Sequence, residues 1–475
     1  MYTTSESHIV FYCFIAIIVG VGLFFSRRKD QNVQQYFGAG KTISNGVIAV
    51  SFLMIAFFNL SLLVLPSLPA EFVSGYSVGI IAIAIVLPLL IGSRLVNSVK
   101  NLINSCSGVC RLFLTIHGLF FLCFVQILVL LHISNFLISQ FFGEANYSLL
   151  VVMIVAAGVY TLVGGLNAVL YTNVVVGVFS IASFVLIFLN TLFFQQPLFF
   201  SLKLALQAGA ENFRMVGAAE TNMAIAVIGI AFIMFWIMWM EFGEAQRKAS
   251  AKTHSISWRE LISSIILLLV MLFGVFSLAE SEIITSHYGV VKNLDVVNHF
   301  IGISFIGGLI GMFAVTFQAV GAVVALRLIP SIKQGVKEEE RVLVGRLSTV
   351  FVVLLSIFFI PFAKASEYAM LIWYINFLAF FSTPIVAAFL SSLLLKKGNT
   401  IGFMSGVFIG EVYACIEFVA QKSETHISFL QSTNAYAFAM EITIVTFCVT
   451  ILSAIASEMI VVQRLFSHIK RSRSA

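Results

Sequence analysis

The sequence predicts an all-α polytopic membrane protein with about 13 transmembrane helices. Of its 475 residues, 60% are hydrophobic and only 10% are charged, and the mean hydropathy is +1.05. A typical soluble domain carries about 25% charged residues, so this composition excludes one. Apolar stretches of roughly 20 residues, enough to cross a hydrocarbon core of about 30 Å, recur along almost the whole chain. Barrel strands would read as short alternating segments, so a β-barrel is excluded as well.

The expected helices share a long apolar centre with short polar gaps between neighbours. They occupy residues 7–25, 43–68, 77–96, 112–141, 147–165, 167–194, 222–243, 259–281, 298–328, 344–364, 367–393, 400–421 and 436–463. No polar segment is long enough to form a soluble domain, so residues 1–475 are expected to be a single transmembrane domain. Residues 1–8 contain Glu6 but no Lys or Arg, unlike the basic start of a signal peptide, and the first run is therefore expected to remain as a helix.

The distribution of basic residues predicts the orientation of the chain. With the N-terminus outside and the C-terminus in the cytoplasm, all but five of the 27 Lys and Arg residues fall on the inner side. The five exceptions are Lys203, Arg214, Lys292, Lys364 and Lys422. The positive-inside rule favours this topology, and we expect a multi-pass protein of the plasma or inner membrane. The net charge of +6 is thus explained by topology, and no nucleic-acid partner is expected.

Motifs that would supply catalytic chemistry are missing from the sequence. It contains no HExxH, GxSxG or CxxC pattern and no pair of aspartates within an apolar run. We therefore expect no enzyme, no catalytic residues and no cofactor. The partners expected instead are a small-molecule solute and membrane lipid, and no obligate protein partner is inferred.

Four short motifs carry a resemblance to a known family. From Tyr160 the chain reads YTLVGGLNAVLYTNVVVG, which resembles the pattern YTxxGGLxAVxxTDxxQ of the sodium:solute symporter family. The segment YFGAGK at 36–41 resembles the family's entry to its first core helix. EAQRKASAK, which contains Gln246 and Arg247, and RVLVGR at 341–346 resemble two further family patterns. These matches appear in the family's order over about 320 residues, and the sodium/proline and sodium/sugar symporters are the members most resembled.

The resemblance implies a fold and an activity. Family members have a LeuT-like core of two inverted five-helix repeats, which here implies residues 43–194 and 222–393. The helix at 7–25 would precede this core and two helices at 400–463 would follow it. A secondary symporter that moves a small organic solute, such as proline or another polar metabolite, by alternating access is the expected function. The alternative is a transporter-like sensor or an uncoupled facilitator with a degraded sodium site.

Polar residues inside the apolar runs are the candidate solute contacts. They are Asn59, Ser61, Gln126, Trp239, Glu241 and Asn376. Asn59 and Ser61 indicate a broken first core helix, although a helix kinked by Pro66 and Pro69 is the other interpretation. An ionisable residue at membrane depth usually has a partner or a role. Glu241 is thus a candidate to bind a charged solute or to carry a proton, or it pairs near the inner surface with Arg247.

The cation site that the resemblance implies is incomplete in this sequence. Its carbonyl ligands would come from Phe57 with either Met54 or Leu60, and from Met312, and its paired hydroxyls would fall at Val315 and Thr316. Valine has no hydroxyl, although a hard cation needs about six oxygen ligands. In the motif Gly164, Gly165, Thr172 and Asn173, the last residue stands where the family has Asp. Coupling to sodium or to protons is therefore left open.

Overall fold

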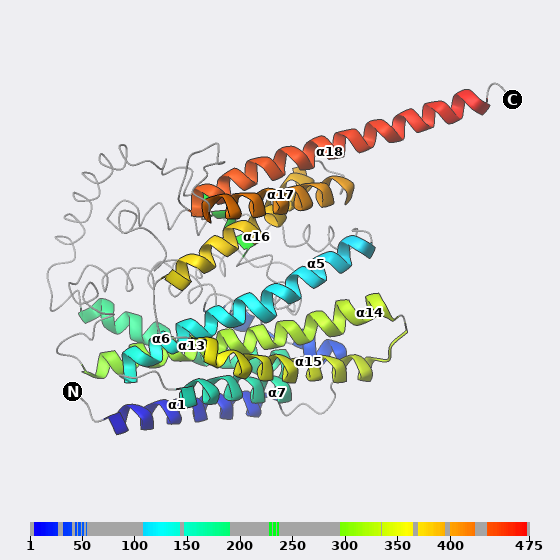
Figure 1. Ribbon diagram of the computed structural model, residues 1–475. Coiled ribbons are helices and arrows are strands. Elements are labelled where there is room, and N and C mark those ends of the chain that lie inside the picture. The colour runs from blue at the N-terminus through cyan, green and yellow to red at the C-terminus, as the bar shows by residue number, and fades with distance from the viewer. Residues whose placement is uncertain are drawn as a thin grey trace, which may run out of the picture. The chain divides into compact units, whose positions relative to one another are not determined.

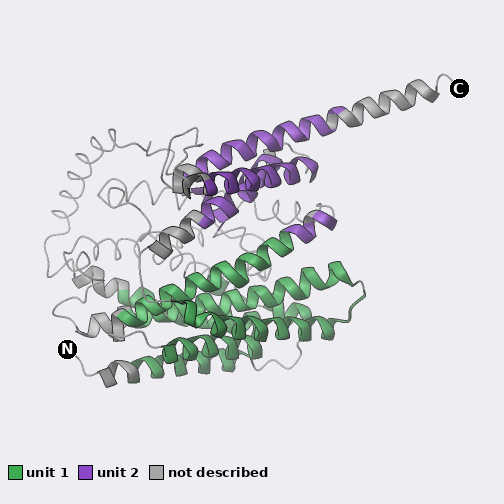
Figure 2. Cartoon of the chain, in the orientation of Figure 1, with its two compact units in different colours: residues 1–69, 114–206, 241–374 green, residues 70–113, 207–240, 375–475 purple. Residues whose placement is uncertain are grey.

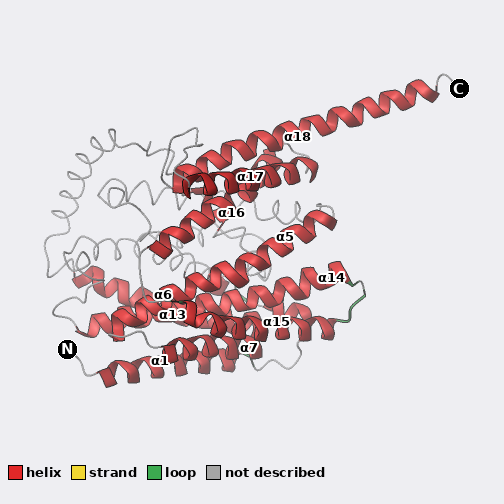
Figure 3. Ribbon diagram, in the orientation of Figure 1, coloured by secondary structure: helices red, strands yellow, loops and turns green. Residues whose placement is uncertain are grey.

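The residues that the computed structural model describes are mostly helical, with short turns and loops between helices (Figure 3). The described residues are 4–26, 32–39, 43–44, 46–48, 50–51, 54, 108–142, 147–190, 228–229, 231–233, 235–236, 295–333, 335–363, 369–394, 400–422 and 435–472. The expected helices at 77–96 and 259–281 lie outside this set, as do most of those at 43–68 and 222–243. The all-helical class is confirmed for the described part, whereas the total of 13 helices and the inverted repeat remain predictions.

The chain divides into two compact units, which are described separately (Figures 1 and 2). The helices of unit 1 are α1 (Thr4–Phe25), α2 (Val33–Gly38), α5 (Gly108–Phe120) from residue 114, η5 (Phe121–Gln126), α6 (Ile127–Phe142), α7 (Tyr147–Asn190), α13 (Asp295–Val323), η8 (Val324–Leu328), α14 (Ile329–Ile332), α15 (Glu338–Phe359) and η9 (Ile360–Phe362). Unit 2 contains α16 (Ala369–Leu394) from residue 375, α17 (Thr400–Lys422) and α18 (Ala435–Ser472).

Two predicted helices, at 147–165 and 167–194, are joined within α7 by a reversal at Gly165. Gly165 has φ 56° and ψ −146°, a conformation that only glycine adopts readily. Tyr160 and Thr172, one on each side of Gly165, both approach Gly22 of α1. Twelve residues of straight helix would separate them by about 18 Å, so the chain must turn back between them. The two arms of α7 are thus joined at Gly165 without an intervening loop.

α13 forms the centre of unit 1 and packs against α7, α15 and α6. Small residues allow its close approach to α7: a side-chain carbon on Gly307 would meet Val176, and one on Gly311 would lie 2.6 Å from the Asn173 side-chain oxygen. Near the other end of this contact the hydroxyls of Ser183 and Ser304 are 2.8 Å apart. Residue numbers rise along α7 as they fall along α13, so these two helices are antiparallel.

Unit 2 contains a similar contact made of glycines. Gly402, Gly406 and Gly410 lie on one face of α17 and meet the backbone or side chains of Ala454, Thr450 and Thr446 on α18. The order of the contacts makes these helices antiparallel, and the spacing of four residues is that of small-residue contacts between membrane helices. α18 continues to Ser472, nine residues beyond the predicted end at 463, because the charged residues that end the apolar run do not interrupt a helix.

Five helices in the described part are long and apolar enough to cross a membrane. They are Arg111–Ser139, Tyr147–Ser183, Gly302–Ile332, Glu338–Phe362 and Ala439–Ser457. On α15 the side chains of Leu347, Phe351, Leu354 and Phe358 are exposed on one stripe, as expected of a surface that faces lipid. These features are those of a multi-pass membrane protein.

Candidate functional site

Asn173 lies about one third of the way along the second arm of α7, the part that follows Gly165. Its side chain connects three helices of unit 1. Its side-chain amide donates a hydrogen bond to the Ser51 hydroxyl at 3.2 Å, and its side-chain oxygen rests against Gly311 of α13. Both Ser51 and Asn173 are buried. Ser51 belongs to the start of the predicted first core helix, so this one side chain ties that helix to α7 and α13. The sequence singled out Asn173 but not Ser51, although a serine within an apolar run was a signal that could have found it.

The predicted cation ligands on α13 follow Gly311: Met312 is the next residue, and Val315 and Thr316 come about one turn later. The hydroxyl of Thr316 donates to the carbonyl of Met312 at 2.9 Å, so these two oxygens are adjacent. Val315 is buried beside them and offers an apolar surface. The described residues therefore supply two neighbouring oxygens of the expected set, fewer than a hard cation requires. Phe57 and Leu60 lie outside the described residues, and Met54 packs against Gly177 of α7.

The remaining motif residue on this face, Thr172, has its hydroxyl occupied within its own helix. It donates to the carbonyls of Ala168 at 2.9 Å and Val169 at 3.0 Å. Such back-bonding is the usual state of a buried threonine in a helix and requires no bound ligand. Thr172 is thus positioned beside Asn173 but points its hydroxyl at the α7 backbone.

Of the predicted solute contacts, Gln126 is the one whose side chain the structure describes. It is buried at the end of η5, a π-helical stretch within the predicted helix at 112–141. π-helical turns inside α-helices are frequent at functional sites. Asn59, Ser61, Trp239 and Glu241 lie outside the described residues. Asn376 lies in α16, where the backbone but not its side chain is described.

Three of the four sequence motifs meet at Tyr36 and Phe37 of α2. The Tyr36 hydroxyl donates to the carbonyls of Thr161 at 3.0 Å and Leu162 at 2.9 Å, at the end of the first arm of α7. The Tyr36 carbonyl accepts a hydrogen bond from the Gln318 side chain of α13 at 3.3 Å. The guanidinium carbon of Arg346 lies 4.8 Å from the centre of the Tyr36 ring, within the range of a cation–π contact. Sequence reasoning identified the motifs but not their mutual contact.

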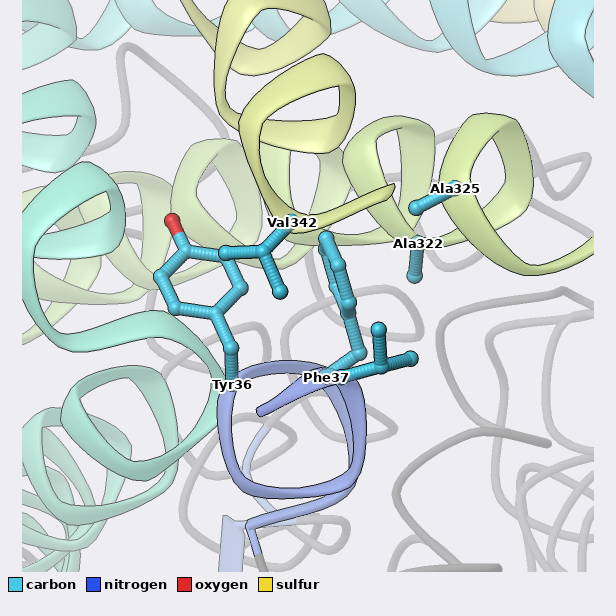
Figure 4. Close-up of a cluster of buried hydrophobic side chains, with 6 residues drawn as sticks. Tyr36, Phe37, Ala322, Ala325 and Val342 are labelled. Atoms are coloured by element: carbon cyan, nitrogen blue, oxygen red, sulfur yellow. The ribbon is translucent and has the colours of Figure 1, made fainter. Parts of the chain in front are cut away.

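A hydrophobic cluster surrounds the neighbouring Phe37 ring (Figure 4). Its buried members are Val33, Tyr36, Phe37, Ala322, Ala325 and Val342. The ring of Phe37 occupies the space over Gly345, where a side-chain carbon would lie 2.2 Å from the ring. Burial raises the pKa of Tyr36 to about 12, partly opposed by Arg346, so the phenol remains a hydrogen-bond donor at neutral pH.

A second group of buried polar side chains lies in unit 2, where the sequence predicted none. The hydroxyl of Tyr413 is 3.2 Å from a carboxylate oxygen of Glu417 on the same helix, and it also hydrogen-bonds Glu441 of α18. Both glutamates are fully buried. The criterion applied to Glu241, an ionisable residue within an apolar run, would have found both of them.

Comparisons with solved structures identify the fold of the chain. The structure is similar over 94% of its length to a Na⁺-coupled sialic acid symporter, with a TM-score of 0.69, 14% sequence identity and 97% of that chain covered. It is also similar to Mhp1, a transporter of the nucleobase-cation-symport-1 family solved in a closed conformation, with a TM-score of 0.51, 12% identity, and 90% and 95% of the two chains covered. The chain has the fold of these membrane transporters. The resemblance expected from the motifs is therefore confirmed for the fold.

Similarity in sequence is also found among curated proteins. Sodium/glucose cotransporter 4 of Mus musculus is 29% identical over 108 residues, which span 22% of this chain and 16% of the mouse protein. No family model matches the chain. All three of these similar proteins are transporters, which agrees with the expectation that the chain is not an enzyme.

Proposed function

We propose that the chain is a secondary symporter, which carries a small polar organic solute across the membrane by alternating access. The observation that carries the proposal is the junction at Asn173, where one buried amide ties the first core helix to α7 and α13 within a transporter fold. A symporter needs such a point because the state of an ion site must be felt by the helices that open and close. The solute is an amino acid such as proline or another small polar metabolite.

Sodium is the first candidate for the coupling ion. The proteins that this chain resembles include Na⁺-coupled symporters. The Met312 carbonyl and the Thr316 hydroxyl are adjacent hard oxygens that a cation could bind, although here the hydroxyl donates to that carbonyl as Thr172 does to Ala168. Phe57 with Leu60 or Met54 would complete the set through backbone carbonyls, which need no particular side chain. Protons are the second candidate, with Glu241 as the group that carries them.

An uncoupled facilitator is a second candidate function, which the chemistry of Asn173 favours. A carboxylate at this position would attract a cation, whereas the neutral amide of Asn173 carries no charge and donates a hydrogen bond to Ser51. Val315, which is buried, removes a further oxygen from the expected set of cation ligands on α13. Under this alternative the fold moves its solute down a gradient without a coupled ion.

We also propose an arrangement of the repeats and a location for the chain. We place the inverted repeats at 43–194 and 222–393, with the helix at 7–25 before them and the helices at 400–463 after them. The protein would lie in the plasma or inner membrane with its N-terminus outside and its C-terminus in the cytoplasm. Thiol labelling from each side of intact cells, at single cysteines introduced near residues 8 and 470, tests this orientation.

Transport in reconstituted vesicles tests the function. Purified protein is first screened for thermal stabilisation by proline, glucose, sialic acid and a hydantoin, each with NaCl or choline chloride. Vesicles are then loaded to impose a sodium gradient or a proton gradient, and uptake of the stabilising solute is followed. Accumulation above the outside concentration under one gradient supports a symporter, equilibration alone supports the facilitator, and no uptake of any stabilising solute contradicts both.

Two variants separate the coupling ions. Glu241→Gln is expected to abolish proton-driven accumulation and to leave sodium-driven accumulation within about twofold of the parent. Val315→Ser restores a hydroxyl beside Thr316 and is expected to lower the sodium concentration that gives half-maximal uptake. Val320→Ser, which places a hydroxyl elsewhere on α13, is the matched control. A sodium dependence unchanged by Val315→Ser contradicts the placement of the site.

A further inference from the structure

Helix α18 has one buried face and one exposed face. Thr450 and Ala454 are buried against the glycines of α17. Leu452, Ile455 and Met459 lie on the opposite side of the helix, where their side chains are 66%, 48% and 58% exposed. Lipid tails are sufficient to cover such a face within the span Ala439–Ser457. The apolar character of this face inside the span therefore identifies no partner by itself.

The helix continues well beyond both the membrane span and the start of α17. Gly402, close to the first residue of α17, lies against Ala454, whereas α18 runs on to Ser472 (Figure 1). From residue 454 to residue 472 an α-helix rises by about 27 Å. α18 contains neither Gly nor Pro, the residues at which helices usually kink, so we expect this extension to leave the membrane in line with the span. Its last turns then lie in water.

Apolar residues of the extension are in phase with the exposed face of the span. Together they recur at alternating spacings of four and three residues, which is the heptad pattern of helices that pair along one seam. The seam consists of Cys448, Leu452, Ile455, Met459, Val462, Phe466 and Ile469. Cys448 is exposed like the three residues that follow it. A face that served only to contact lipid would not stay apolar, in the same phase, for three more turns in water.

The opposite face of α18 changes its character where α17 ends. Thr450 and Ala454 occupy this face beside α17. Arg464, His468 and Arg471 follow these two residues at multiples of seven, so they take the corresponding positions on the extension. This face becomes basic once the helix that covers it has ended, whereas the seam remains apolar. The contrast indicates that the seam keeps a partner along its whole length.

We infer that two copies of this chain pair through α18 as a parallel two-stranded coiled coil, which begins inside the membrane and continues beyond it. Both copies cross the membrane in the same direction, so a twofold axis along the seam brings each seam residue against its own counterpart. Burial of these side chains on both copies removes roughly 800–1,700 Å² of surface, which overlaps the range of about 1,200–2,000 Å² for specific interfaces. The pairing concerns assembly and is independent of the solute and of the coupling ion.

Disulfide cross-linking of the whole chain in liposomes tests the seam. In a background without the six native cysteines, single cysteines replace Leu452, Met459 or Phe466 on the seam. Ser457→Cys and Arg464→Cys, at matched depths on the opposite face, are the controls. A disulfide requires two Cα atoms within about 7 Å of each other, a distance that a parallel pair reaches at its seam. Oxidation with copper phenanthroline is expected to give about fivefold more covalent dimer from the seam positions than from the controls.

A second substitution shows whether the extension contributes to the pairing. Phe466→Glu places a carboxylate on the seam outside the span, where the melting temperature of the chain should change little. Combined with Leu452→Cys, it is expected to lower the yield of covalent dimer about fivefold, because two buried carboxylates would face each other at the seam. His468→Glu puts the same charge on the opposite face and should leave the yield unchanged.

Three results overturn the inference. Equal yields from the seam and from the opposite face would show random collision of single chains. A lack of cross-links at every position would show that the chain does not pair. Cross-links at Leu452→Cys without cross-links at Phe466→Cys, together with protection of the latter from a water-soluble maleimide in anionic vesicles alone, would assign the extension to the lipid surface.

Discussion

The carbonyl oxygen of Tyr36 lies against Gly165, only 2.5 Å from the place where a side-chain carbon would stand. The glycine has positive φ, so two separate constraints require it: the turn between the arms of α7 and the approach of α2. A pattern recognised in sequence as a family motif is thus explained by a contact between residues that are 129 positions apart.

Gly165→Ala is expected to destabilise the protein strongly. The backbone conformation alone costs an alanine about 1–3 kcal/mol, and the clash with the Tyr36 carbonyl adds to this. Loss of monodisperse protein, or a drop of at least several degrees in apparent melting temperature in detergent, is the expected observation. Gly20→Ala on α1 is the control, because a side-chain carbon there meets nothing. Equal stability of the two variants would show that α7 does not turn at Gly165.

The long helices in the described part of the chain lie where the sequence predicts helices, because each one needs a long apolar run to cross the membrane. Residues such as Glu338 and Lys470 show where that signal fails, since helices α15 and α18 extend into polar sequence that the apolar criterion does not see. The contact of Tyr36 with Thr161 and Arg346 could not be predicted, because no local pattern tells which distant segments meet. The same holds for Ser51, whose partner Asn173 is 122 residues away.

Removal of the Tyr36 hydroxyl is expected to change how stability depends on alkaline pH. Burial raises the pKa of Tyr36 from 10.0 to about 12 in the folded protein. A raised pKa means that the folded state holds this proton more tightly than the unfolded state does. The protonated phenol therefore contributes fully to the free energy of unfolding below pH 10, and this contribution is lost as the pH rises toward 12. Wild-type protein should therefore lose stability more steeply than Tyr36→Phe between pH 9.5 and about 11. Melting temperatures measured at pH 8 to 11 check this, and parallel curves for the two proteins contradict it.

Ala39→Gly is expected to stabilise the described conformation. An alanine in the left-handed region costs roughly 1 kcal/mol, which glycine does not incur. The gain should be partly offset by the greater freedom of glycine in the unfolded chain, so a rise of a few degrees in melting temperature is expected. Gly38→Ala, at a neighbouring position with negative φ and free space, provides the comparison. A lower melting temperature for Ala39→Gly would show that Ala39 is not in the left-handed conformation.

Glu417→Gln is expected to leave stability unchanged or to raise it at pH 8. The Tyr413 hydroxyl has one proton, but it faces both Glu417 and Glu441 in a buried setting, where two carboxylates repel each other. A glutamine removes one charge and its amide can donate to the Tyr413 oxygen. Glu338→Gln, at the exposed start of α15, removes a carboxylate without touching this group. A clear loss of stability in Glu417→Gln alone would indicate that Glu417 pairs with a cationic group.

Asn173→Asp is expected to make the stability of the protein depend on sodium. The substitution keeps the shape of the side chain but replaces the donor to Ser51 with a carboxylate oxygen, buried between α7 and α13. An unpaired buried carboxylate is costly, so the melting temperature in choline chloride should fall by several degrees. Sodium at the same ionic strength should recover most of this loss, because a cation that binds at the junction pairs with the buried carboxylate in the folded state only.

The comparison of salts distinguishes a specific site from general screening. Ser304→Asp places a carboxylate in the same α7–α13 contact, beside Ser183 and away from Met312. The melting temperature of this variant should fall by the same amount in sodium chloride and in choline chloride. If Asn173→Asp also responds equally to sodium and choline, no cation site exists at this junction, and the amide serves only to hold the first core helix to α7. If sodium rescues Asn173→Asp alone, the neutral residue at position 173 is what separates this chain from a tightly sodium-dependent transporter.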